Sequence, residues 1–311
     1  MNPIIDNIYQ KAKSSIKKIV LVEPQDDRVQ KAAKIAADQK LAEIIMVDKT
    51  ENNPLFDQFV EQFYQLRRDK GITLDQAKNI IKNPLYFGTM MVHSGLADGM
   101  VAGATNTTQE TFRPALQIIK TKPEEKIISS FFIIETLDNN FGQNGIFIFA
   151  DCGLNIDPDA QTLSQIAIQS SKSFNQLIGP TPKIAMLSYS TNSSSTGSSV
   201  DKVRLATQLT KQSNPSLIVE GEIQADAALI PSIAISKFPQ SQLQGQANIL
   251  IFPNLDSGNI AYKLVERLGH VHAFGPLTQG IKKPINDLSR GCGVDDIVTT
   301  IAITSVQSMS N

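Results

Sequence analysis

The densest group of reactive side chains lies in the segment from Asp287 to Asp296. Within it, Ser289, Arg290 and Cys292 supply a hydroxyl, a guanidinium and a thiol. A guanidinium beside a helix N-terminus can hold an anion through its planar fork and the unpaired backbone N–H groups. The same residue types also make an ordinary helix cap with a surface ion pair. The segment therefore leaves two interpretations open, an anion-binding site or a capped helix end.

A helix must follow this segment, because apolar residues recur at positions 294, 297, 298 and 301. This spacing predicts a helix over residues 294–306 with one buried face. Asp295 and Asp296 then fall in its first turn, where the macrodipole and free N–H groups favour negative charge.

Two further loops carry hydroxyl side chains directly after an expected strand. Residues 104–108 follow the strand 99–103 and precede a helix with Arg113, and residues 188–199 follow the strand 184–187. Open α/β sheets bind ligands at such strand ends, so both loops are candidate anion sites. The alternatives are capping residues for the first loop and a flexible solvated loop for the second.

Composition limits the class of protein. The 311 residues contain 29 basic and 30 acidic side chains, so no basic surface indicates nucleic acid. Apolar runs such as 127–134 are too short to span a bilayer. The two cysteines match no metal-ligand spacing, and we expect a reduced, cytoplasmic protein without a bound metal.

The alternation of expected strands and helices predicts an α/β, doubly wound architecture. A turn-rich stretch, 139–144, joins the strands 127–134 and 145–149, which indicates an antiparallel hairpin. We expect a first domain of residues 1–125 plus 277–311 and a second of residues 126–276. The C-terminal helix then returns to the first domain, and the active cleft is expected between the two.

Local signals also predict several helix ends. Thr73 and Gln76 form a capping box, and Asp157 with Pro158 is expected to begin the next long helix. Residues 256–259 are expected to form a loop before a helix that starts at Ile260. The expected strand 271–274 is followed by Gly275 and Pro276, which should lead out of the second domain.

Taken in order, the chain resembles the phosphate acetyltransferases and their phosphate butyryltransferase relatives. The likeness covers nearly the whole chain and rests on several long motifs in the family's own order. The matching pieces are YFGTMMV at 86–92, ADGMVAGA at 97–104, RPALQIIK at 113–120, FADC at 149–152, AMLSYST at 185–191, GEIQ at 221–224, IFP at 251–253 and NDLSRGC at 286–292.

This resemblance implies reversible transfer of an acetyl group between acetyl phosphate and coenzyme A (CoA). It also implies two α/β domains with a cleft between them, as in isocitrate and isopropylmalate dehydrogenases, and a homodimer. Coenzyme A is then a substrate, and no bound cofactor is expected.

The resemblance also assigns roles to single residues. Asp296 is similar to the family's base for the CoA thiol, and Ser289 and Arg290 to the pair that holds the acyl phosphate. Arg267 matches a second active-site arginine, and Ser190 and Thr191 fall in a matching motif expected to contact the acyl phosphate. Arg67 and Arg113 match arginines that meet the CoA phosphates.

The chemistry explains these residue types. A thiol with an ordinary pKa near 8.5 is mostly protonated at neutral pH, so a base or a cationic environment must supply thiolate. Arginines can clamp the charge of acetyl phosphate while phosphate leaves. The position of Asp296 in a first helical turn favours its charged form and makes it a weak base. Either a desolvated cleft compensates, or arginines activate the thiol and Asp296 orients it.

Cys292 offers a competing covalent mechanism through an acetyl-enzyme. A structural cysteine is the alternative, and we favour it because no histidine lies nearby in sequence to activate the thiol.

The chain departs from the family pattern at a few places. Asn106 stands where histidine is common, Asn192 where lysine is common and Gly293 where serine often caps the helix. Compared with typical members of the family, the chain is shorter by roughly twenty residues in the region 48–54.

A butyryl- or propionyl-preferring transferase and a catalytically lapsed binding protein remain alternatives. No Gly-x-Gly-x-x-Gly follows the first strand, which disfavours a nicotinamide dehydrogenase.

Overall fold

The computed structural model describes residues 2–309, which form two compact α/β units. The N/C unit contains residues 5–125 and the chain from Ile281 onward. The central unit contains residues 126–280 with the N-terminal residues through Ile4. Each unit has its own sheet with helices packed on it, so the predicted doubly wound α/β class is confirmed. Among the described helices, none is long and apolar enough to cross a membrane.

The sheet of the N/C unit has four parallel strands in the order β10-β3-β1-β2. Their bounds are β1 Lys18–Leu21, β2 Glu43–Met46, β3 Gly99–Ala102 and β10 Ile285–Asp287. Because the strands are parallel, the loops after β1, β3 and β10 all leave the same edge of the sheet. The loop after β3 contains the hydroxyl residues 104–108, and the turn after β10 contains Ser289 and Arg290.

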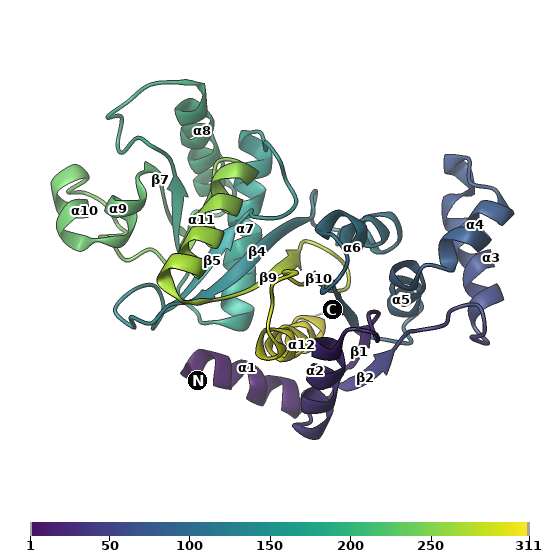
Figure 1. Ribbon diagram of the computed structural model, residues 1–311. Coiled ribbons are helices and arrows are strands. Elements are labelled where there is room, and N and C mark those ends of the chain that lie inside the picture. The colour runs from purple at the N-terminus through teal and green to yellow at the C-terminus, as the bar shows by residue number, and fades with distance from the viewer. Residues whose placement is uncertain (1, 310–311) are drawn as a thin grey trace. The chain divides into compact units, whose positions relative to one another are not determined.

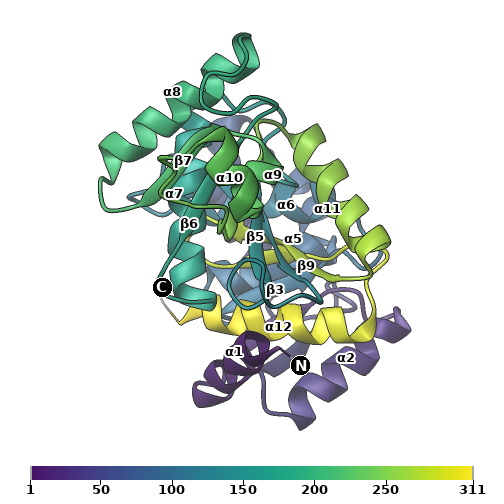
Figure 2. The ribbon, with the colours of Figure 1, turned by 90° about the vertical axis from the view of Figure 1, so that its left-hand side faces the viewer.

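Helices cover both faces of this sheet (Figures 1 and 2). On one face lie α2 (Asp27–Asp38) and α12 (Val294–Ser308), which pack against each other. On the other lie α5 (Pro84–His93) and α6 (Thr108–Pro114), which a π-helical turn at Ala115–Ile119 extends. The remaining helices are α1 (Pro3–Ser14), α3 (Phe56–Arg67) with a 3-10 turn at Arg68–Lys70, and α4 (Leu74–Ile81).

The helix α12 differs from its prediction in how much of it is buried. Every residue from Ile297 to Ser308 is buried, not only one face, because α12 contacts α2, β1, β3 and β10. Its buried hydroxyl side chains form hydrogen bonds within the protein. The Oγ1 of Thr304 donates to the carbonyl of Thr300 and accepts from the amide of Asn286 at 2.8 Å.

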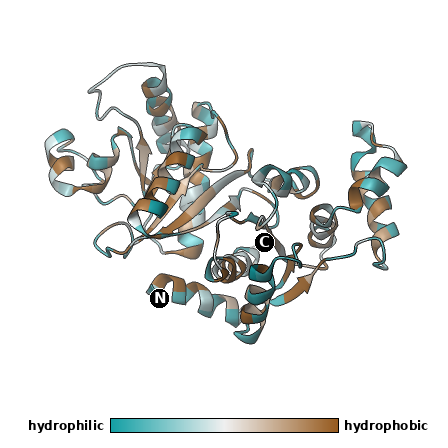
Figure 3. Cartoon of the chain, viewed as in Figure 1, coloured by the Kyte–Doolittle hydropathy of each residue, from teal (hydrophilic) through white to brown (hydrophobic). Residues whose placement is uncertain are grey.

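The sheet of the central unit has six strands in the order β7-β6-β8-β5-β4-β9. Its strands are β4 Ser129–Glu135, β5 Ile146–Ala150, β6 Lys183–Leu187, β7 Ile218–Ile223, β8 Ile249–Ile251 and β9 His272–Gln279. The helices are α7 Ala160–Leu177, α8 Ser198–Ser213, α9 Ala225–Leu229, α10 Pro231–Lys237 and α11 Leu255–Gly269. The predicted antiparallel hairpin is confirmed as β4 and β5. Figure 3 shows β4 mainly in hydrophobic colours, as expected of a buried strand.

Two predicted helix starts are wrong. The helix α7 begins at Ala160 and is capped by Asp159, while Asp157 pairs with Lys202 at 2.6 Å instead. The helix α11 includes the expected loop 256–259, because the Asn254 side chain caps it through the N–H of Ser257. Gly258 suits that helix, since a Cβ there would come within 2.6 Å of the Asp151 carbonyl.

The end of the central sheet also differs from expectation. Gly275 and Pro276 do not lead out of the sheet but lie within β9, which pairs with β4 as far as Gln279. A register shift between Phe131 and Ile133 accommodates them, and Gly275 has a φ of 147° that glycine adopts readily.

A buried carboxylate, Asp287, ends β10. It has no exposed surface, and neither of its oxygens has a hydrogen-bond partner of normal geometry among the described residues. Burial raises its pKa from 3.8 to about 7, although Thr108, Thr111 and the backbone of Leu288 act in the opposite direction. A Cβ on Gly103 would lie 2.0 Å from Asp287 Oδ1, so only glycine fits beside it.

Asp287 should make the stability of the chain fall as the pH rises. The unfolded carboxyl titrates near 3.8 and the folded one near 7, so the folded state holds an extra proton between these values. The stability from that proton is complete below the unfolded pKa and is lost as the pH passes the folded pKa. For Asp287→Asn, we expect the loss of unfolding free energy between pH 5 and pH 8 to shrink by about 3 kcal/mol, because the extra proton is lost over about two pH units of that window. Denaturant unfolding at both pH values measures it, and equal losses in both proteins would contradict the prediction.

Candidate functional site

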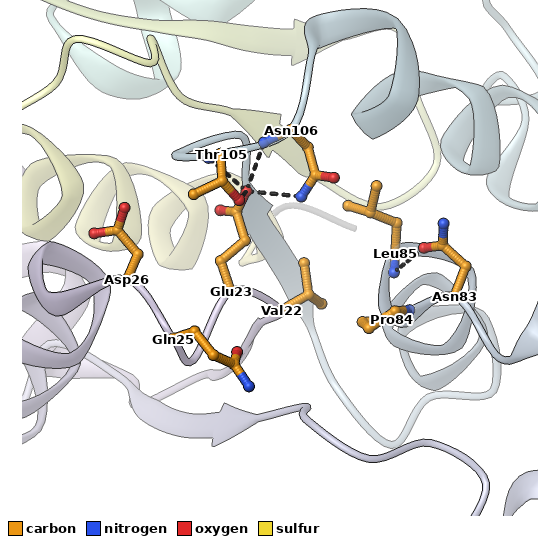
Figure 4. Close-up of a pocket in the computed structure, with 9 residues that line it drawn as sticks. All are labelled: Val22, Glu23, Gln25, Asp26, Asn83, Pro84, Leu85, Thr105 and Asn106. Carbon is orange, nitrogen blue, oxygen red and sulfur yellow. Dashed lines mark hydrogen bonds between the residues drawn. The ribbon is translucent and has the colours of Figure 1, made fainter.

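The loop after β3 is organised by Glu23, which follows β1. One oxygen of this buried carboxylate accepts the backbone N–H of Ala104 at 2.9 Å. The other accepts the N–H groups of Thr105 and Asn106 at 2.8 and 3.0 Å and the amide of Asn106 at 2.7 Å. Figure 4 shows the carboxylate of Glu23 directed at this loop. The loop thus binds an anion that belongs to the protein itself.

The helix cap expected of the loop 104–108 is present. Thr107 caps α6 in a capping box, in which its hydroxyl accepts from the N–H of Glu110 and the Glu110 side chain accepts from the N–H of Thr107. The hydroxyls of Thr105 and Thr107 donate to Glu23 and to Glu110, and a contact of this loop with a substrate anion stays a prediction. The capping interpretation is confirmed.

A second internal charge, Arg28 of α2, connects the same loop to the turn after β10. Its guanidinium pairs with Asp26 at 2.7 Å and donates to the carbonyl of Ala104 at 2.9 Å. It also donates to the carbonyls of Arg290 and Cys292 at 2.9 and 3.0 Å. The three loops that leave one edge of the sheet are thereby joined.

The turn itself holds the predicted catalytic residues at the start of α12. Ser289 is half-buried and Arg290 is exposed. The carboxylate of Asp296 accepts the N–H of Gly293 at 2.8 Å, which is the cap expected of an acid in the first turn. Asp287, in contrast, is not part of the turn, because it ends the buried strand β10.

Cys292 lies in the same turn but is buried. Burial raises its pKa to about 11; the positive charge of Arg28 lowers it and the negative charge of Asp296 raises it. A thiol with this pKa is almost entirely protonated at neutral pH, so it is a poor nucleophile. The geometry favours the structural interpretation of Cys292.

Three of the predicted arginines gather in the N/C unit. The charges of Arg113 and Arg67 both act to lower the pKa of Tyr86, against the larger effect of burial. Glu110 likewise has its pKa lowered, first by hydrogen bonds from Thr107 and also by Arg113 and Arg290. Within residues 2–309, none of the three arginines lies at salt-bridge distance from a carboxylate. Arg113 and Arg290 therefore act on one carboxylate, Glu110, without forming a salt bridge with it.

A cavity of about 200 Å³ lies beside the loop that Glu23 organises (Figure 4). Its lining includes no lysine or arginine; the residues are Val22, Glu23, Gln25, Asp26, Asn83, Pro84, Leu85, Thr105 and Asn106. Two carboxylates and three side-chain amides give it a polar wall that does not suit a phosphate group. Asn106, one of the departures from the family pattern, therefore faces a different environment from the three arginines.

In the central unit, the predicted ligands Ser190 and Thr191 lie inside their own loop. The buried hydroxyl of Ser190 donates to Glu222 at 2.9 Å, and Glu222 is held by two bonds from Arg204. The Thr191 hydroxyl exchanges hydrogen bonds with Gln224 at 3.0 and 3.1 Å. The loop is thus tied down rather than freely solvated, and a direct contact of these hydroxyls with substrate stays a prediction.

The other predicted residues of the central unit are more exposed. Arg267, near the end of α11, has a side chain that is 63% exposed and lies 3.7 Å from Glu266. Asn192 is exposed and has a positive φ of 47°. In the part of the chain that the structure describes, no three His, Cys, Asp or Glu side chains gather in a way that could hold a metal ion.

Two residues that organise the loops of the N/C unit, Glu23 and Arg28, are not among the candidates predicted from the sequence. Glu23 does carry a signal, because it is an acid directly after a buried strand. Arg28 carries none, because it reads as an ordinary residue in the first turn of a helix. Their partners become visible only once the sheet order is known.

Comparison with known proteins agrees with this architecture. The family model described as "Phosphate acetyl/butaryl transferase" matches residues 3–305. A phosphate acetyltransferase of Acetivibrio thermocellus is 47% identical, over 98% of this chain and 98% of that protein. One from Clostridium acetobutylicum is 41% identical with the same coverage of both chains.

Solved structures give the same result. A phosphotransacetylase from Streptococcus pyogenes is 39% identical and superposes with a TM-score of 0.92, covering 100% of this chain and 99% of that one. A branched-chain phosphotransacylase from Enterococcus faecalis shares the fold at 18% identity and a TM-score of 0.68, covering 94% and 99%. This chain is therefore an enzyme that belongs to the phosphate acetyl/butyryl transferase family of acyltransferases.

Proposed function

We propose that the protein transfers an acetyl group reversibly between acetyl phosphate and coenzyme A. The observation that carries this proposal is that Arg67, Arg113 and Arg290, in the unit that also holds Asp296, form no salt bridge among the described residues. Both substrates are phosphorylated anions, which arginine binds well. Membership of the family and relatives named phosphate acetyltransferase support the same reaction.

In the proposed mechanism, the reaction proceeds by direct attack in a ternary complex. Asp296 accepts the proton of the CoA thiol, and the sulfur attacks the carbonyl carbon of acetyl phosphate. The bond from that carbon to the bridging oxygen breaks, and inorganic phosphate leaves with the bond's electrons. Ser289 and Arg290 hold the acyl phosphate and its developing charge, while Arg67 and Arg113 bind the phosphates of CoA.

Several finer points of the proposal rest on family likeness. They are a second acyl-phosphate contact at Arg267, contacts at Ser190 and Thr191, a homodimer and a cytoplasmic location. Kinetics of Arg267→Lys would test the contact of Arg267 with the acyl phosphate. Light scattering of the purified protein would test the homodimer.

The activity itself is tested by CoA-dependent release of phosphate from acetyl phosphate, with loss of free thiol followed in the same reaction. Equal amounts of phosphate released and thiol lost support acyl transfer. A series of acetyl, propionyl and butyryl phosphates then identifies the preferred acyl group. Absence of turnover with every member would support the alternative of a lapsed binding protein.

The base role predicts a specific defect for Asp296→Asn. The amide oxygen can still accept the N–H of Gly293, so the helix cap is retained while the negative charge is lost. We expect turnover to fall by roughly 10²- to 10⁴-fold, with a much smaller change in the KM for CoA. The remaining rate should rise between pH 7 and pH 9, as the CoA thiol ionises by itself.

Asp295→Asn provides the matched control, because Asp295 is the exposed neighbour in the same helical turn. It should keep nearly the full turnover. If Asp296→Asn turned over as fast as the unmodified enzyme at every pH, Asp296 would not be the base.

Cys292 should not carry the acetyl group. Because burial keeps its thiol protonated, incubation with labelled acetyl phosphate in the absence of CoA should leave no label on the protein. Cys292→Ala should retain acetyl transfer, with a modest loss of stability from the small cavity. Stoichiometric label at Cys292 that CoA then removes would instead establish the covalent mechanism.

A further inference from the structure

The guanidinium of Arg28 uses all of its donors inside the protein. Its Nε donates to Asp26 Oδ1 at 3.0 Å and its Nη2 to Asp26 Oδ2 at 2.7 Å. The second Nη2 hydrogen goes to the carbonyl of Ala104, and Nη1 serves the carbonyls of Arg290 and Cys292. A guanidinium has five N–H donors, so none is left for a ligand. Arg28 therefore acts on the site through other residues.

Its contacts lie on three separate loops. Asp26 belongs to the loop after β1, Ala104 to the loop after β3, and Arg290 and Cys292 to the turn after β10. Carbonyl groups in loops lack the partners that a strand or helix provides, so they need such a donor. One planar cation thus sets the position of the turn that carries Ser289 and Arg290.

The cation is itself held in place. Asp26 caps α2 through the N–H of Arg28 and forms a two-bond fork with its guanidinium. The Asp26 side chain is 11% exposed and that of Arg28 32%. This pair lowers the pKa of Asp26 and raises that of Arg28, each mainly through their hydrogen bond, so both remain charged. A rotating surface arginine would have no such effect on the turn.

We propose that Arg28 is a positioning residue for acyl transfer: it clamps the turn of Arg290 and Cys292 so that Ser289 and Arg290 meet the acyl phosphate in a fixed geometry. The role of Arg28 in acyl transfer rests on the proposed function, but the clamping of the turn by Arg28 does not. Among the described residues, neither Arg67 nor Arg113 shares a hydrogen-bond partner with Arg28, so the clamp should affect acetyl phosphate and leave CoA binding alone.

The test uses Arg28→Lys in the full chain. A lysine keeps the charge next to Asp26 but offers one point of contact in place of a planar fork. We expect kcat to fall by roughly 10- to 100-fold and the KM for acetyl phosphate to rise, with the KM for CoA within about twofold of the unmodified enzyme. In Arg28→Ala, millimolar guanidinium should restore part of the lost turnover.

A second readout does not depend on activity. Iodoacetamide alkylation of Cys292, followed on its peptide by mass spectrometry, reports opening of the turn, because the residue is only 6% exposed. Arg28 lowers the pKa of Cys292, so loss of the cation alone would slow alkylation. A rate at least about tenfold faster in both variants therefore supports the clamp. Lys31→Ala, on the exposed side of the same helix, is the control and should change neither readout.

The outcomes separate the two proposals. Alkylation of Cys292 at the unmodified rate in both variants, or an equal rise in the KM of both substrates, would overturn the clamp. Faster alkylation in a protein that shows no acyl transfer before mutation would support the clamp and remove the proposed function.

Discussion

The parallel pairing of β10 with β3 is the constraint on which the N/C site depends. The chain leaves this unit after residue 125 and returns at Ile281, and Ile285 then pairs beside Met100. Only this register places the turn of Ser289 and Arg290 at the edge where the loops after β1 and β3 also end. Parallel strands need such long crossovers, and here the crossover contains an entire second unit.

Strand pairing alone does not fix loops, and two opposite internal charges complete the arrangement. Glu23 collects backbone N–H groups from the loop after β3, and Arg28 collects carbonyls from that loop and from the turn after β10. Each is a partly or fully buried charge whose cost of desolvation is offset only while its partners remain in place. Removing either would leave several backbone groups unsatisfied at once.

Sequence patterns predicted what local physics determines. The capping box of Thr73 and Gln76 and the hairpin of β4 and β5 depend on neighbouring residues, and both are confirmed. The start of α7 was wrong because Asp157 prefers a partner, Lys202, that lies 45 residues away. The complete burial of α12 was also missed, since threonine and serine look solvent-facing until their hydrogen bonds inside the core are known.

In the candidate site, too, residues close in sequence were predicted, and contacts between distant residues were not. The resemblance to the family predicts roles for Ser289, Arg290 and Asp296, which lie within one segment of eight residues. Arg28 escaped notice because its carbonyl partner at Arg290 lies 262 residues along the chain. Every residue type has a backbone carbonyl, so a hydrogen bond to a carbonyl cannot be predicted from a sequence motif.

The two charges that act on Cys292 also bear on how a CoA thiol would react in this turn. Asp296 raises the pKa of the Cys292 thiol and Arg28 lowers it, and burial outweighs the cation. A substrate thiol placed beside Asp296 would feel the same negative charge, which opposes a standing thiolate. In the proposed reaction, Asp296 must therefore take the proton as the sulfur attacks, rather than store a thiolate beforehand. The exposed guanidinium of Arg290 would then act where charge develops, on the phosphate that leaves.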